Sequence, residues 1–175
     1  MAQDGLRGGF IARMLRHWWL DESDARKAIP PDLLERLTRR IAASEKRHTG
    51  EVRIYVEAGL PMSYLWRKAT PRERAVAIFG KLRVWDTEDN NGVLIYLLLA
   101  EHSIEIVADR GLARHVAPDE WRAIVARLGA ALHEGRFEDG LTQALGEVSA
   151  LLVAHFPAAQ GAVNANELPD EPVLG

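Results

Sequence analysis

The chain contains no cysteine among its 175 residues. That absence excludes disulfide bonds, zinc sites with thiolate ligands, iron–sulfur clusters and cysteine nucleophiles. Acidic and basic residues nearly balance, with 22 Lys and Arg against 25 Asp and Glu and a formal charge of −3. The chain therefore lacks the basic excess that nucleic-acid binding uses, and we expect no nucleic-acid partner.

Long hydrophobic runs and common catalytic motifs are also missing. The longest uninterrupted apolar run, Val93 to Ala100, is too short to cross a bilayer. Arg13, Arg16 and His17 interrupt the place where a secretory signal would carry its apolar core, so we expect a cytoplasmic protein. No G-x-S-x-G elbow, phosphate-binding P-loop, G-x-G-x-x-G or H-E-x-x-H motif occurs in the sequence.

What the sequence does contain begins with an amphipathic pattern near its N-terminus. Its apolar residues follow helical spacing: Leu6, Phe10, Ile11, Met14, Leu15, Trp18 and Trp19. This pattern predicts a helical extension within residues 1–29. Two interpretations stay open. The stripe of residues 6–20 packs on its own domain, on a partner protein or on a second copy, or it lies on a membrane surface with Arg7, Arg13 and Arg16 facing the lipid headgroups.

The central part of the chain alternates between strand and helix patterns. Strands are expected at 51–57, 93–100 and 104–109, and helices at 32–48, 71–84, 118–135 and 137–156. A helix between the first two strands makes them parallel, and a tight turn makes the third antiparallel to the second. We therefore predict an α/β domain over residues 30–156, with a central mixed β-sheet flanked by α-helices. Residues 157–175 lack any period and are predicted to form a disordered acidic tail.

An acidic loop, residues 86–92, precedes the most apolar predicted strand, 93–100. The predicted topology brings this loop and the end of the third strand to one edge of the sheet, together with Glu51. The candidate ligands at that edge are Asp86, Asp89, Asn90, Asn91 and Asp109. Oxygen ligands in an irregular loop suit calcium, or magnesium with bound waters, although the spacing is not that of an EF-hand. The alternative is a polar turn, in which these side chains cap backbone amides.

Three segments together resemble the TPM domain family. They are "NNGVLIYLLLA", then "IEIVADRGL", and later "EGRFEDGLTQALGEVSALL". That family includes thylakoid-lumen phosphatase-like proteins and many bacterial proteins of unknown role, and the similarity covers roughly residues 32–156. The resemblance implies a mixed sheet between helices. It also implies divalent-cation binding near the acidic loop in some members, with Asp86, Asp89, Asn90 and Asn91 matching the loop and Asp109 the strand end.

The sequence favours one function and leaves a second open. The first is a non-catalytic binding or accessory module of a cytoplasmic bacterial type, modulated by a cation. The second is a metal-dependent, phosphatase-like hydrolase. A hydrolase needs a nucleophile or metal-activated water, an acid, and a positive group beside the phosphoryl oxygens. Only Arg110 is expected near enough for that last role, so the catalytic residues and the small-molecule substrate stay unknown.

Overall fold

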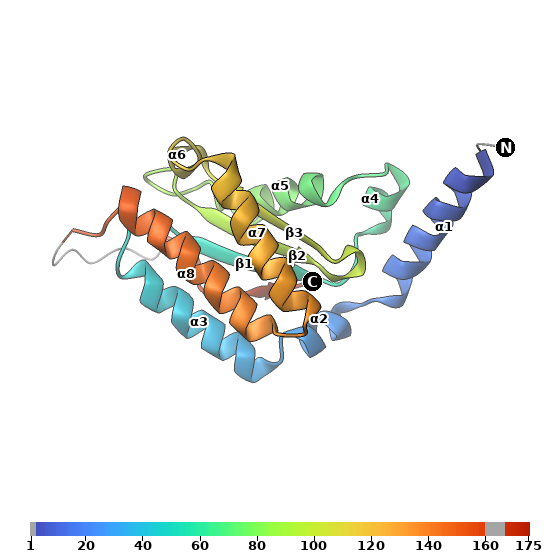
Figure 1. Cartoon of the computed structure of the whole chain (residues 1–175), viewed down its shortest axis with the longest axis horizontal. Coiled ribbons are helices and arrows are strands. Elements are labelled where there is room, and N and C mark those ends of the chain that lie inside the picture. The colour runs from blue at the N-terminus through green and yellow to red at the C-terminus, as the bar shows by residue number, and fades with distance from the viewer. Residues whose placement is uncertain (1–2, 160–166) are drawn as a thin grey trace.

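The computed structural model describes residues 3–159 and 167–175. Its centre is a four-stranded sheet in the order β3-β2-β1-β4. The strands are β1 (Val52–Glu57), β2 (Val93–Leu98), β3 (Ser103–Ala108) and β4 (Val173–Leu174). Helices α3 (Pro31–Glu45), α7 (Pro118–His133) and α8 (Phe137–His155) cover one face, and α5 (Pro71–Lys81) covers the other (Figure 1). The predicted α/β class, with a mixed sheet between helices, is confirmed.

The pairing of the three main strands also follows the prediction. β1 and β2 run parallel from Val52 opposite Val93 to Glu57 opposite Leu98. β2 and β3 run antiparallel, joined by a short 3-10 turn, η1 (Leu99–Glu101). Every residue of β1 and β2 is buried, which explains why the second strand shows no polar alternation in the sequence.

The two faces of the sheet belong to separate hydrophobic clusters. Ile54 and Ile95 point into the cluster formed with α3, α7 and α8, whereas Tyr96 points into the cluster with Ile78 of α5. Local signals position the helices that form these clusters. Thr70 caps α5 through a capping box with Glu73, and prolines open α3, α5 and α7, where a missing N–H has no cost.

The predicted disordered tail is wrong for residues 167–175. β4 adds to the free edge of β1 in parallel, with Tyr55 opposite Val173. The N–H of Ala58 donates to the carbonyl oxygen of Gly175 at 2.8 Å, and the N–H of Gly175 donates to Val56 O at 3.0 Å. An unpaired sheet edge offers such backbone partners to any extended segment that reaches it. At the start of the tail, the N–H of Ala158 donates to Arg47 O at 3.0 Å, and residues 160–166 lie outside the described part of the chain.

The N-terminal 29 residues divide into two helices with different roles. α2 (Glu22–Ala28) belongs to the packed domain, because Ala25 and the following Ile29 are buried in its main core. α1 (Gln3–Trp19) extends from one end of the molecule beside α4 (Met62–Trp66) (Figure 1). The side chains of Leu6 and Phe10, two members of the predicted stripe, lie outside the described residues. Among the described helices, none is both long and apolar enough to cross a membrane.

Candidate functional site

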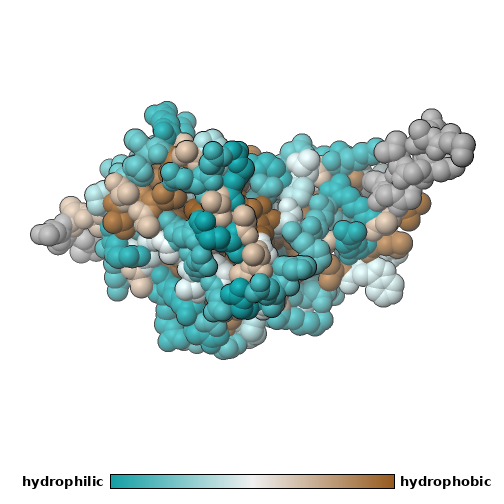
Figure 2. Space-filling view, in the orientation of Figure 1, coloured by the Kyte–Doolittle hydropathy of each residue, from teal (hydrophilic) through white to brown (hydrophobic). Residues whose placement is uncertain are grey.

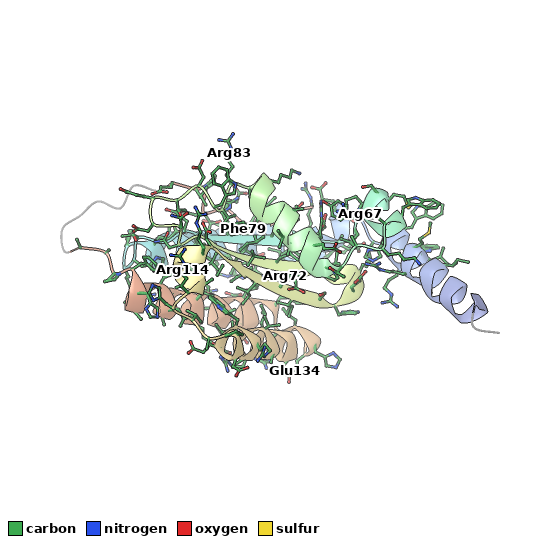
Figure 3. All side chains as sticks on the ribbon, turned by 90° about the horizontal axis from the view of Figure 1, so that it is seen from above. Arg67, Arg72, Phe79, Arg83, Arg114 and Glu134 are labelled. Carbon is green, nitrogen blue, oxygen red and sulfur yellow. The ribbon has the colours of Figure 1, made fainter. Side chains whose placement is uncertain are left out.

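The acidic loop between α5 and β2 is built from two consecutive turns. The N–H of Asp86 donates to Arg83 O at 2.8 Å, and the N–H of Asn90 donates to Thr87 O at 3.2 Å. Arg83 and Asn90 have φ values of 54° and 53°, a left-handed conformation that Asn tolerates better than most residues. Arg83 points away from the domain (Figure 3). Main-chain hydrogen bonds therefore close both turns of the loop.

Thr49, just before β1, ties together two of the predicted ligands. Its hydroxyl donates to Oδ2 of Asp89 at 2.8 Å and accepts a hydrogen bond from Nδ2 of Asn91 at 3.0 Å. The N–H of Asn91 donates to the Thr87 hydroxyl at 3.1 Å. The two bonds of Thr49 hold the acidic loop against the start of β1, which confirms the closeness that the parallel topology predicts for these two segments, and the third bond braces the loop itself.

The end of β3 meets the same loop through its backbone. The N–H of Asp109 donates to Gly92 O at 2.8 Å, and the N–H of Gly111 donates to Asn90 O, also at 2.8 Å. The guanidinium of Arg110 donates to Oδ1 of Asn90, with its two nitrogens at 2.8 and 3.1 Å. A Cβ on Gly111 would lie 2.4 Å from the carbonyl oxygens of residues 89 and 90. Only glycine permits this approach. We call the contact between the acidic loop and residues 109–111 the junction.

Two side-chain oxygens at this junction have no hydrogen-bond partner among the described residues. They are Oδ1 of Asn91 and Oδ2 of Asp109, and both atoms are buried. Asn91 is fully buried, and its chain neighbours Asn90 and Gly92 are the residues that bond to the Asp109–Gly111 segment. A buried oxygen without a donor has lost its hydrogen bonds to water and has gained none from the protein, which is unfavourable. Such atoms are the feature of this edge that fits a positively charged ligand.

The charge at the edge is lower than the sequence predicts. Asp86 and Glu88 are exposed, and neither side chain takes part in the bonds that join the loop to Thr49 or to β3. Within the described residues, no three His, Asp or Glu side chains come together in a way that could hold a metal. Any ligand set must therefore combine the carboxylates of Asp89 and Asp109 with amide or main-chain oxygens.

Two other residues expected at this edge lie beside it, but their side chains have partners outside the junction. Glu51 is buried, and its Oε1 accepts the N–H of Glu167 from the tail at 3.1 Å. Burial raises the pKa of the Glu51 carboxyl above its usual value. His115 stacks on His155 of α8, with 4.9 Å between ring centres. Thr49 and Thr87 are the site residues that sequence reasoning missed, and the position of Thr49 directly before the first strand was the available signal.

Comparison with known proteins places the chain in a family. The family model of the TPM domain matches residues 23–151. This chain belongs to the TPM domain family. The chain is also similar to the NMR structure of the BA42 protein from the psychrophilic bacterium Bizionia argentinensis, with a TM-score of 0.70 and 23% sequence identity. That similarity covers 86% of this chain and 94% of the other, and it shows the shared fold. No curated protein matches the chain.

Proposed function

We propose that this TPM-domain chain is a non-catalytic binding or accessory module whose acidic edge holds a weakly bound divalent cation. The observation that carries this proposal is the pair of buried, unpartnered oxygens of Asn91 and Asp109 at the junction of loop and strand. A cation there would give both atoms the positive partner that the described residues do not supply. The expected cytoplasmic location stays a prediction, which subcellular fractionation would test.

The donors that would hold the cation are all oxygens. They are the carboxylates of Asp89 and Asp109 and the oxygens of Asn90 and Asn91, with Asp86 adding negative charge from its exposed position. Calcium accepts six to eight oxygens in a flexible arrangement, whereas magnesium demands a near-ideal octahedron, so an irregular loop favours calcium over magnesium. When bound, the ion would neutralise the two carboxylates and tie the acidic loop to the end of β3.

The same contacts argue for a binding role and against the hydrolase alternative. The carboxylate of Asp89 already accepts the Thr49 hydroxyl, and Oδ1 of Asp109 accepts the N–H of Arg110 at 2.6 Å. The Arg110 guanidinium is engaged with Asn90 and would have to leave it to reach a phosphoryl group. The groups that phosphate hydrolysis would need are thus arranged to hold the loop together.

A calcium titration of the thermal melt tests the proposal. A loop site with few charges should bind in the range of about 10⁻⁴–10⁻³ M. At about ten-fold excess over that dissociation constant, a ligand specific for the folded state adds about 1.4 kcal/mol to the free energy of unfolding. Wild type should therefore melt at a visibly higher temperature in about 10 mM calcium, and magnesium should raise it less.

The variants Asp89→Asn and Asp109→Asn should lose most of this shift. Asp139→Asn serves as a matched control, because Asp139 is an exposed aspartate on α8 and plays no part in the junction. The proposal fails if wild type shows no shift, or if the two edge variants shift as far as the control does. In that case the acids are only turn residues.

A further inference from the structure

Helix α1 is fixed to the domain by one of its faces. Arg13 donates to Oε1 of Glu101 at 2.6 Å and to the carbonyl oxygen of Ala69 at 2.7 Å. Nδ1 of His17 accepts the N–H of Leu60 at 2.9 Å, and its Nε2 lies 2.8 Å from the same Glu101 oxygen. His17 is 5% exposed. These contacts set the rotation of the helix about its own axis.

Over residues 11–19, the opposite face of α1 is apolar and lies in solvent. At 100° per residue, Ile11, Leu15, Trp18 and Trp19 fall within an arc of about 100°, on the side of the helix away from Arg13 and His17. Trp18 is 75% exposed and Trp19 82%, and Ile11 and Leu15 are about half exposed. This free face of α1 borders the grey residues in Figure 2. Because the Arg13–Glu101 ion pair and the hydrogen bonds of His17 hold the other face, the helix cannot roll to bury these side chains.

Three exposed positive charges lie on α1 or beside it. Arg16 is on the flank of α1, and Arg67 and Lys68 follow α4 beside it (Figure 3). None of the three takes part in an ion pair within the described part of the chain, and Arg67 stacks over the Tyr64 ring at 4.1 Å. Three acids follow the Trp18–Trp19 pair in sequence, and each is engaged: the carboxylate of Asp21 caps α2, Glu22 pairs with Arg26, and Asp24 pairs with Lys27.

From this combination we propose that the free face of α1 binds the surface of an anionic lipid membrane. Tryptophan side chains prefer the headgroup level of a bilayer, where the ring is half buried and its N–H stays wet. Aliphatic side chains beside them enter the acyl boundary, and exposed Arg and Lys attract anionic headgroups. The exposed Arg and Lys side chains on and beside α1 therefore favour an anionic lipid surface over an apolar groove on a protein partner. This inference is independent of the cation proposed above.

Membrane contact at α1 would leave the acidic edge in solution. α1 is anchored to segments that follow the C-terminal ends of β1 and β2, namely Leu60 and Glu101. The acidic edge lies where β1 and β2 begin and β3 ends. The two sites are thus separated by the length of six-residue strands, about 20 Å. Calcium at the edge should consequently not bridge the protein to lipid.

The test is flotation of the full chain, in chelator, with vesicles of phosphatidylcholine alone or mixed in equal parts with phosphatidylglycerol. Wild type should float with the mixed vesicles. Trp18→Ser/Trp19→Ser should lower the partition coefficient at least about 100-fold. Arg16→Glu should lower it about 30-fold on mixed vesicles only. Trp85→Ser, which replaces another half-exposed tryptophan at the acidic end, should bind like wild type.

Several results would overturn the proposal. Wild type that does not float, or a Trp18→Ser/Trp19→Ser variant that floats as well as wild type, would each exclude the free face of α1 as a membrane surface. A third is self-association. If wild type sediments as a dimer without vesicles, does not float, and becomes monomeric in the double variant, the face binds a second copy of the chain. Unchanged melting temperatures in all variants show that folding is not the cause.

Discussion

Glu45 should make the protein less stable as the pH rises through neutrality. This residue ends α3, is only 6% exposed, and accepts the N–H of Val52 at 3.0 Å. Burial is the main cause that raises the pKa of its carboxyl to about 9, and the nearby acids Glu51 and Asp170 contribute, Asp170 also through a hydrogen bond. The folded protein therefore keeps a proton on Glu45 that the unfolded chain, with a pKa near 4.5, has already lost.

The sign of the effect follows from proton linkage. Between about pH 4.5 and pH 9 the folded state binds one more proton than the unfolded state, so the free energy of unfolding falls with rising pH. The steepest slope for one proton is about 1.4 kcal/mol per pH unit. Over two units the upper limit is about 2.7 kcal/mol, and we expect about 1–2 kcal/mol because local rearrangement and water relieve part of the burial.

Urea denaturation of wild type and Glu45→Gln between about pH 6.5 and pH 8.5 measures this slope. The Gln amide can still accept the Val52 N–H and donate to Asp170, but it does not titrate. The variant should gain about 1–2 kcal/mol relative to wild type across this interval. Burial lowers the pKa of His48 to about 4, which gives an opposite slope, so more acidic conditions are avoided. A difference between the two proteins that stays constant with pH would refute the assignment.

Three further outcomes are expected. Arg74→Met should lower the free energy of unfolding by about 3–5 kcal/mol, measured by denaturation, because it leaves the buried carboxylate of Glu57 without the guanidinium that contacts it at 2.9 Å. Adding Glu57→Gln to Arg74→Met should recover part of that loss. Gly111→Ala should lower the melting temperature, since its methyl group meets two carbonyl oxygens of the acidic loop, whereas Gly146→Ala, in open space on a helix, should not. The protein should not turn over p-nitrophenyl phosphate, with or without divalent metal; robust turnover that Asp89→Asn abolishes would favour the hydrolase alternative.

Much of the fold was predictable because its long elements carry strong local patterns. The capping box at Thr70 and the alternation of β1 each identify one element, and a helix between two strands makes them parallel. The short helices α2, α4 (Met62–Trp66) and α6 (Arg110–Ala113) bury few side chains each, so no periodicity reveals them. The order of β4 comes from the open edge of β1, a property of the partner strand that the composition of the tail does not contain.

The candidate site was predictable only at the level of topology. Strand directions are enough to bring the acidic loop beside Thr49 and beside the end of β3, and the contacts agree. The outward position of Asp86 and the bridging role of Thr49 depend on two left-handed residues in the loop and on side-chain rotamers. A one-dimensional pattern carries neither kind of information, which is why the sequence overestimates the charge at the edge.

The central claim is that a cation joins the acidic loop to the end of β3. The most direct measurement is a calcium titration of the amide NMR spectrum of the full chain. Saturable shifts should be confined to Thr49, residues 87–92 and residues 109–111, should share one dissociation constant, and should vanish in Asp109→Asn. Shifts spread over the exposed acids of the surface, or centred on Glu167 and Glu171 of the tail, would contradict the account.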